Sequence, residues 1–205
     1  MNEKILCKLQ KELWAKISGV SSSFYLAGGT ALALHLGHRE SIDFDFFIQE
    51  EFSPEKLLKK LKKIGVVNVL DQSESHINII INSVKVSYFH YPYQLIEDCK
   101  SYKNINIAQI KDILPMKLIA VSQRSVKKDF IDIYAAIKNG WALDYMFELL
   151  SRKFSGISYN HVNILKGLTY FEDAEKDEMP KVLDDIAWED VKLTLEKEAL
   201  RILNC

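Results

Sequence analysis

The sequence predicts an α+β fold in which a small mixed sheet is flanked by helices and followed by a helical C-terminal part. Two observations predict this class. In the first half of the chain, short apolar or alternating runs of strand length stand between segments with helical periodicity. From Ala108 onward the pattern is mostly helical. We therefore divide the chain into an α/β core over residues 1–100 and a mainly helical part over residues 101–205, which we expect to complete a cleft.

The first predicted elements are two helices and two strands. Residues 3–17 have helical periodicity, with apolar residues at Leu6, Leu9, Leu13 and Ile17. A short apolar run at 23–27 suits a buried strand, and the good helix formers at 30–36 suit a buried helix. The second strand carries the sequence Asp43-Phe44-Asp45-Phe46.

A third helix and three strands complete the predicted core. Ser53 is a suitable helix N-cap and Pro54 a suitable first residue, so we expect a helix from there to about Lys63. The strands are expected at 66–70, 76–81 and 84–89, with a hairpin turn at Asn82-Ser83 and a break at Tyr91-Pro92-Tyr93. The later helices are expected at 108–123, 126–138, 143–154, 160–170 and 188–203.

Length and composition fit one domain, or one domain with a helical extension. The chain has 205 residues and a formal net charge of −1, and no apolar run is long enough to span a membrane. Its N-terminus lacks the apolar core of a signal peptide. Cys7, Cys99 and Cys205 are far apart and odd in number, which favours free thiols and a cytoplasmic location. The histidines form no spaced cluster, so a zinc site is not expected.

A glycine pair, Gly28-Gly29, stands between the first predicted strand and the helix after it. Glycine lets the backbone turn sharply and approach a ligand closely. A helix that begins here would direct its free N–H groups and the positive end of its dipole toward an anion. The pair and the following Thr30 are therefore candidates for binding phosphate oxygens.

Thirteen residues separate Gly29 from an aspartate pair. Asp43 and Asp45 are two apart on a predicted strand, so both side chains point to one face while Phe44 and Phe46 point to the other. Neighbouring carboxylates repel each other unless a cation lies between them, and Mg²⁺ favours carboxylate, phosphate and water oxygens. Alone, each motif would be a turn or a solvated strand edge. Their combination is more specific and suggests a nucleotidyltransferase.

The combined pattern resembles the signature of the DNA polymerase β-like nucleotidyltransferase superfamily. Gly28-Gly-Thr-Ala-Leu, then Arg39, Ser41 and Asp43-Phe-Asp-Phe-Phe, is similar to one branch, the AbiEii/AbiGii toxin family. Two later stretches support that branch: Asp112-Ile-Leu-Pro-Met-Lys117-Leu-Ile-Ala and Lys127-Lys-Asp129-Phe-Ile-Asp132-Ile-Tyr. The resemblance covers about residues 20 to 140 and implies the polymerase β-like fold.

One position departs from the superfamily pattern, in which a neighbouring strand often supplies a third carboxylate. We expect Ser87 at that position. Serine is a poorer metal ligand, so the difference could mean a weaker second metal, a ligand from elsewhere, or lost catalysis. Because the toxin branch tolerates this gap, we do not interpret it as inactivation.

Three later residues are further candidates for catalysis. Lys117 lies among apolar neighbours, although most lysines are solvated, and it could neutralise charge on a departing pyrophosphate. Asp129 and Asp132 share one helix face. Asp129 could be a first-turn acid favoured by the helix dipole, whereas Asp132 lies in an apolar run and needs a basic or metal partner. The resemblance implies that one of this pair positions the lysine or completes the acidic site.

Charged residues near these motifs leave alternatives open. Arg39 and Ser41 could hold phosphate, but a loop salt bridge suits Arg39 nearly as well. The acidic segment at 172–190 could repel RNA or bind a basic partner. A basic region could form a phosphate-binding strip or two solvated helix faces; its members are Lys100, Lys103, Lys111, Lys117, Arg124, Lys127 and Lys128.

The expected reaction transfers a nucleoside monophosphate from a nucleoside triphosphate to an acceptor hydroxyl. Gly28, Gly29 and Thr30 would hold the β- and γ-phosphates, and Asp43 and Asp45 would bind Mg²⁺. The resemblance implies an RNA acceptor, the 3′ end of tRNA, and an antitoxin protein as partner. Two alternatives stay open: a nucleotidyltransferase acting on a small molecule or a protein, and an inactive domain that binds a nucleotide or a partner.

Overall fold

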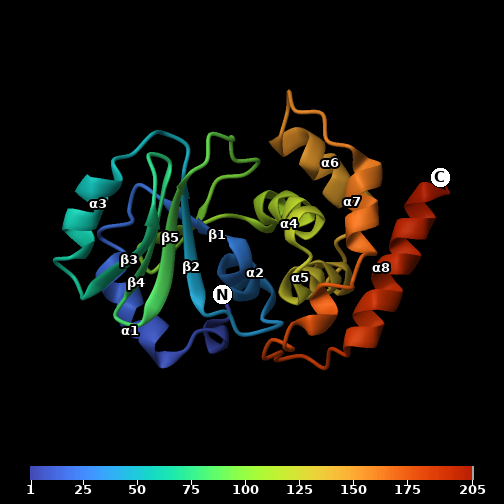
Figure 1. Ribbon diagram of the computed structural model, residues 1–205, viewed down its shortest axis with the longest axis horizontal. Coiled ribbons are helices and arrows are strands. Elements are labelled where there is room, and N and C mark those ends of the chain that lie inside the picture. Colours follow the sequence, from blue (N-terminus) through green and yellow to red (C-terminus); the bar gives the residue numbers. More distant parts are fainter. Residues whose placement is uncertain (205) are drawn as a thin grey trace.

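A mixed seven-stranded sheet forms the centre of the molecule in the computed structural model, which describes residues 1–204. The strand order is β3-β4-β5-β2-β1-β7-β6 (Figure 1). The strands are β1 (Tyr25–Ala27), β2 (Asp43–Ile48), β3 (Val67–Gln72), β4 (His76–Ile81), β5 (Val84–His90), β6 (Lys100–Tyr102) and β7 (Ile105–Ile107). The sheet is mixed because β2 pairs with β5 and β1 with β7 in parallel, whereas the other pairs are antiparallel.

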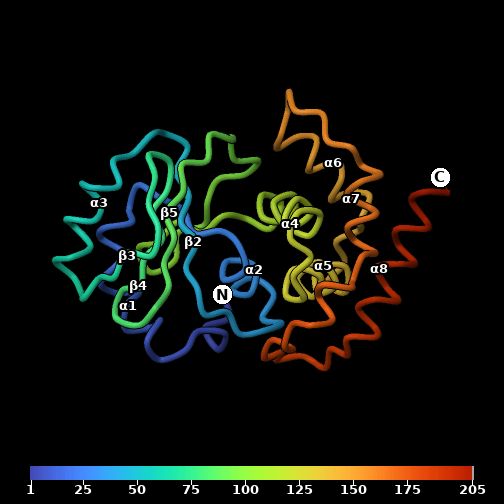
Figure 2. Tube along the Cα trace, viewed as in Figure 1, coloured from blue at the N-terminus to red at the C-terminus, as the bar shows by residue number. Residues whose placement is uncertain are grey.

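The helices lie on both sides of this sheet. Figures 1 and 2 show α1 and α3 on one side, and α2 with the five C-terminal helices on the other. The helices within residues 1–204 are α1 (Lys8–Ile17), α2 (Gly28–Leu36), α3 (Pro54–Leu61), α4 (Ile110–Arg124), α5 (Lys127–Lys138), α6 (Leu143–Lys153), α7 (His161–Leu168) and α8 (Trp188–Leu203). This arrangement confirms the predicted fold class, a sheet flanked by helices with a helical C-terminal part.

Alternation along β2 separates a core face from a polar face. Phe44 and Phe46 are fully buried, and the ring of Phe44 meets that of Trp14 on α1 at 5.6 Å. Asp43 and Asp45 point to the opposite face, which carries α2 and α4. The alternation predicted from the sequence is therefore confirmed, and it places both aspartates between the sheet and the helical part.

Local capping and turn chemistry also behave as predicted around α3 and the β4–β5 hairpin. The Ser53 hydroxyl accepts a hydrogen bond from the backbone N–H of Lys56 at 3.3 Å, which satisfies one free donor of the first turn of α3. Asn82 and Ser83 have φ values of 48° and 67°. Both therefore adopt the left-handed conformation that a tight two-residue hairpin turn requires.

The N-terminal helix differs from its prediction. Residues 3–17 form a short 3₁₀ turn (Glu3–Ile5) and then α1, rather than one continuous helix. Leu9 is 46% exposed, while Gln10 is fully buried. The Gln10 amide donates to the backbone carbonyl of Ser41 at 2.7 Å, so a tertiary hydrogen bond turns a polar residue inward. Leu6, Leu13 and Ile17 are buried as predicted, so Leu9 alone of the four predicted apolar positions departs.

Two short strands, β6 and β7, were missed by the sequence analysis. β7 runs parallel to β1 and extends the sheet to Ile107, beyond the predicted division of the chain at residue 100. Each strand has only three residues, so neither carries enough alternation to be detected. The division into two parts itself stays a prediction.

The C-terminal part packs back onto the loop that precedes β2. Backbone hydrogen bonds join Glu40 N–H to Lys181 C=O at 2.8 Å and Leu183 N–H to His38 C=O at 2.9 Å. Segments far apart in the chain thus meet beside the aspartate strand. No helix within residues 1–204 is long and apolar enough to cross a membrane.

Candidate active site

The glycine pair forms the start of α2 and lies directly against the aspartate strand. Gly28 has φ +67°, and a Cβ added there would lie 2.8 Å from Asp45 Oδ2. A Cβ at Gly29 would lie 2.6 Å from Arg39 Nη2. Real Cβ atoms do not come this close to other heavy atoms, so a side chain at either glycine would displace Asp45 or Arg39. The helix begins at Gly28, at the glycine pair as predicted, and its free N–H groups lie beside the aspartates.

Substitution of Gly28 by alanine is expected to destabilise the protein and to lower transferase activity by about a hundredfold, because Asp45 must move. Gly140→Ala is the matched control, since Gly140 has φ +88° with no atom within 4 Å of an added Cβ. In both variants alanine must adopt the left-handed backbone conformation, at a cost of about 1–2 kcal/mol. Only Gly28→Ala also displaces a carboxylate. Thermal unfolding and transfer rates measure the difference. Equal activity in the two variants would contradict this account.

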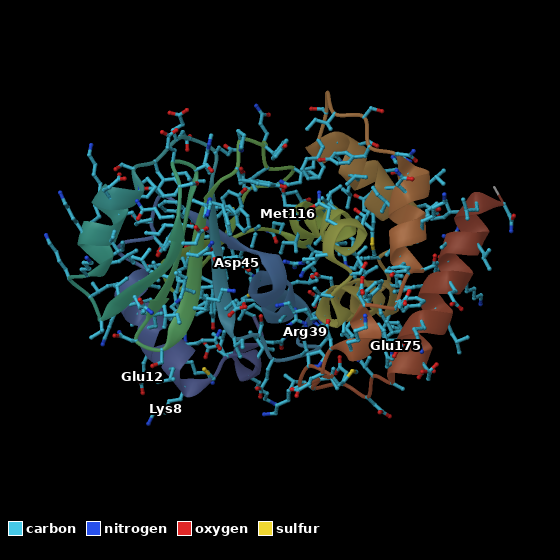
Figure 3. The ribbon with its side chains drawn as sticks, in the orientation of Figure 1. Lys8, Glu12, Arg39, Asp45, Met116 and Glu175 are labelled. Carbon is cyan, nitrogen blue, oxygen red and sulfur yellow. The ribbon has the colours of Figure 1, made fainter. Side chains whose placement is uncertain are left out.

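Asp43 and Asp45 form an acidic pair in the cleft between the sheet and α4; Figure 3 shows Asp45 at this position. Burial, and then the charge of Asp43, raise the pKa of Asp45 above its ordinary value. The cations of the cleft do not pair with it directly: Arg39 and Lys117 bind Asp132, and Arg124 binds Asp129. Two crowded carboxylates with no direct cationic partner within residues 1–204 suit a divalent cation. The pair therefore fits the predicted Mg²⁺, which takes one or two protein carboxylates together with phosphate and water oxygens.

Ser87 lies beside Asp45 on β5, as predicted, and the two residues are register partners. The Ser87 hydroxyl hydrogen-bonds Asp45 and opposes the rise in its pKa. Further along this row of the sheet comes the carboxylate of Asp71, on β3. Three strand spacings, about 14 Å, separate β3 from β2 in the strand order. Asp71 is therefore too distant to replace the absent acid.

A buried ion network lies behind the aspartate pair. The Lys117 ammonium contacts Asp129 Oδ1 at 2.7 Å and Asp132 Oδ2 at 2.6 Å. Arg39 binds both oxygens of Asp132, at 2.7 and 2.9 Å. Arg124 binds Asp129, also through two hydrogen bonds. Two carboxylates thus meet three cations, which leaves one excess positive charge beside the cleft.

The charges in this network outweigh the cost of burying them. Burial alone would lower the pKa of Lys117, but Asp132 and Asp129 raise it. Burial alone would raise the pKa of Asp132, yet Arg39 and Lys117 hold it well below its usual range. Lys117 is therefore a charged residue held by two acids, not a solvated surface lysine. The basic partner that Asp132 was expected to need is present.

Residues 13–107 match the sequence model of a family described as "Nucleotidyl transferase AbiEii toxin, Type IV TA system". The matched segment contains the glycine pair and the aspartate pair. The chain is also 37% identical, over 196 residues, to an uncharacterized protein of Aquifex aeolicus. That match covers 91% of this chain and 92% of the relative. The chain belongs to the AbiEii nucleotidyltransferase toxin family. It is a nucleotidyltransferase.

Solved structures similar to this AbiEii family member share its fold. A putative nucleotidyltransferase from Helicobacter pylori has a TM-score of 0.62 and 18% identity, with 97% of this chain and 96% of that one covered. JHP933, also from H. pylori, has a TM-score of 0.62 and 19% identity, with 100% and 94% covered. MenT4, a nucleotidyltransferase toxin from Mycobacterium tuberculosis, has a TM-score of 0.56 and 12% identity, with 100% and 88% covered. The fold is the polymerase β-like nucleotidyltransferase fold that the sequence resemblance implied.

Several predicted residues of the AbiEii site have structural partners that the sequence did not reveal. Arg39 forms the salt bridge that was one of its two predicted alternatives, although its side chain also lines the cleft. The Thr30 hydroxyl donates to Ser41 Oγ and contacts the backbone carbonyl of Asp43, and Thr30 is 1% exposed. Its side chain therefore supports the aspartate strand, which leaves its backbone N–H as the group to test for phosphate binding. Ser41 lies on the cleft wall.

The basic region, for which a phosphate-binding strip was one of two alternatives, divides into paired residues and residues that line the cleft. Lys103 pairs with Glu3, Lys111 pairs with Glu97 at 2.5 Å, and Lys127 contacts Asp177 in the acidic segment. Three members of the basic region, Lys117, Arg124 and Lys128, line the cleft with the aspartates. Lys85 joins them from β5 and was missed, because only the register of β2 and β5 places it beside Asp43.

Cys205 lies outside the described residues, and Cys7 and Cys99 are free thiols.

Proposed function

We propose that this chain transfers a nucleoside monophosphate from a nucleoside triphosphate to an RNA hydroxyl, as the toxin of a toxin–antitoxin pair. One observation carries the proposal. A cleft of about 410 Å³ brings together Gly29 at the start of α2, the two aspartates and several cations. These are the groups that a triphosphate and its metal require. The family description, a type IV toxin–antitoxin nucleotidyltransferase, supports the toxin role and implies an antitoxin partner.

The position of each protein group determines its proposed role in phosphoryl transfer. The N–H groups at the start of α2 would hold phosphate oxygens, favoured by the helix dipole. Mg²⁺ held by Asp43 and Asp45 would neutralise phosphate charge and polarise the α-phosphate for attack. The excess positive charge of the network, presented by Lys117 and the half-exposed Arg124, would stabilise the leaving pyrophosphate. Asp129 and Asp132 would act by positioning these cations, because both are fully buried behind them.

The proposed acceptor of the nucleoside monophosphate is the 3′ end of tRNA, because the chain resembles the AbiEii/AbiGii toxin branch. Cations on the cleft wall, Lys85 and Lys128 among them, are suited to contact an RNA backbone. The overall charge of −1 is unlike that of a general nucleic-acid binder, so RNA contact is assigned to these local cations.

The first experiment incubates purified protein with Mg²⁺, bulk tRNA and each of the four α-labelled nucleoside triphosphates. Wild-type protein is expected to label tRNA with a preferred base, whereas an Asp43→Ala/Asp45→Ala variant should not. Label that appears on a protein or small molecule, and never on tRNA, would remove the tRNA acceptor and keep the reaction class. An absence of label with every acceptor would leave an inactive binding domain.

A further inference from the structure

Three rows of side chains cross the cleft-facing surface of the sheet. Asp43 and Lys85 form the first row, and Asp45, Ser87 and Asn78 the second. The third row is aromatic. It contains Tyr25, Phe47, Phe89 and His76, which are partners in register on β1, β2, β5 and β4. The aromatic row therefore lies one pleat beyond Asp45.

Neighbouring rings of this row are stacked on one another with a lateral offset. Phe47 and Phe89 have centroids 5.3 Å apart with an interplanar angle of 29°. Tyr25 continues the row at 5.9 Å and 25°, and His76 continues it at 6.2 Å and 28°. Phe47 and Phe89 are both half-buried, whereas core aromatics such as Phe46 are fully covered. Both rings line the cleft, so the part of each ring that its row neighbours leave uncovered can contact a flat ligand.

The cleft consists of two hollows that meet at Asp45. Both hollows are lined by Gly29, Asp45 and Lys117, and also by Arg124 and Phe89. The first hollow adds charged groups, including Arg39, Lys85 and Lys128. The second, of about 380 Å³, adds Phe47, Tyr91, His90, Met116, Ala120 and Gln123. The first hollow thus has three further cations beside Asp43 and Asp71, whereas the second is lined mainly by apolar and aromatic groups. In the view of Figure 3, Met116 lies above Asp45 and Arg39 lies below it.

A nucleoside triphosphate has the same polarity, with an anionic tail at one end and a flat aromatic base at the other. We propose that it lies across Asp45 with its phosphates in the cationic hollow and its base stacked on Phe47 and Phe89. This inference rests on the proposed function and adds the orientation of the substrate. The reverse orientation would place four or so phosphate charges against aromatic rings and the base among lysines, which costs desolvation on both sides.

The wall opposite the rings supplies the group that selects the base. Gln123 projects from α4, is exposed, and lines only the aromatic hollow of the two. Its amide both donates and accepts, so it can pair with the edge of a stacked base. Met116, on the same helix, offers an adaptable apolar surface for the other face of the base. Selection of the preferred base in the transfer reaction is thus assigned to residues of α4 and of the aromatic row.

The test compares binding of nucleoside triphosphates with binding of inorganic triphosphate, both with Mg²⁺, by calorimetry. Phe89→Ala should weaken the preferred nucleoside triphosphate about tenfold or more, since that is the scale of base–aromatic stacking. It should leave the affinity for inorganic triphosphate unchanged. Phe89→Leu keeps the packing volume and should show the same selective loss, which guards against misfolding of the alanine variant. Lys128→Ala is the matched control and should weaken both ligands by the same factor.

The outcomes separate this inference from the proposed function. If wild-type protein binds nucleoside and inorganic triphosphate equally tightly, or if both Phe89 variants bind nucleotide normally, the stacking assignment is overturned and the transferase proposal stands. If wild-type protein binds neither ligand, both proposals are overturned. Gln123→Ala should change the ranking of the four nucleotides without changing the affinity for inorganic triphosphate. An unchanged ranking would remove Gln123 from the assignment.

Discussion

Asp45→Asn is expected to abolish nucleotidyl transfer, by about a thousandfold or more, without loss of stability. Activity falls because one of the two proposed metal ligands is lost. Stability is preserved for an independent reason: the carboxylate of Asp45 is crowded by burial and by Asp43, which together raise its pKa. Asparagine removes that unfavourable charge with almost no change in shape. The melting temperature of the variant without metal should therefore equal or exceed that of the wild type.

The measurement pairs transfer rates with thermal unfolding in the presence and absence of Mg²⁺. Mg²⁺ should raise the melting temperature of the wild type by binding the folded state, and it should have a smaller effect on Asp45→Asn. Asp71→Asn is the control, because Asp71 is an acid on the same face of the sheet but three strands away. It should retain activity within about threefold, since its charge is exposed and distant. Equal losses in the two variants would indicate a general charge effect rather than metal binding.

The parts of the site that were predictable from the sequence are encoded by local patterns. Gly28-Gly29 marks a strand-to-helix turn, and two aspartates separated by a phenylalanine must share one face of a strand. These inferences need only the period of a strand and the conformational freedom of glycine. Ser87 was placed from the superfamily pattern, and the register of β2 and β5 sets it opposite Asp45.

The remaining features depend on contacts between distant segments. The bidentate pair of Arg39 and Asp132 joins residues 93 positions apart, and no pattern near either residue specifies it. The sequence indicated only that Asp132 needed a partner. The aromatic row is equally hidden, because its rings come from four strands and align only through the registers of the sheet. Burial explains why Arg39 pairs with Asp132: an unpaired charge would be too costly there.

Asp132→Asn is expected to lower the free energy of unfolding by about 3–5 kcal/mol, because it leaves Arg39 and Lys117 buried with one carboxylate fewer. Transfer should also fall at temperatures where the variant is folded, since both cations lose the group that positions them. Asp112→Asn is the matched control. Asp112 is fully buried and binds Lys153 at 2.7 Å, but neither residue lines the active-site cleft. The control should lose comparable stability and keep its kcat, which separates positioning from folding.

The pH dependence of unfolding gives a second test of this network. The pKa of Asp132 is held well below its ordinary value, so its stabilisation is fully present above about pH 4, the unfolded pKa of aspartate. It is lost as pH falls from there through the folded pKa, because the unfolded chain then binds one more proton than the native protein. Asp132→Asn should abolish this difference of one bound proton. The free energy of unfolding of the variant should therefore fall less steeply between about pH 4 and pH 2. A decline as steep as that of the wild type would mean that Asp129 and other acids, not Asp132, carry the acid-sensitive stability, and that the network is held together chiefly by Asp129 with Lys117 and Arg124.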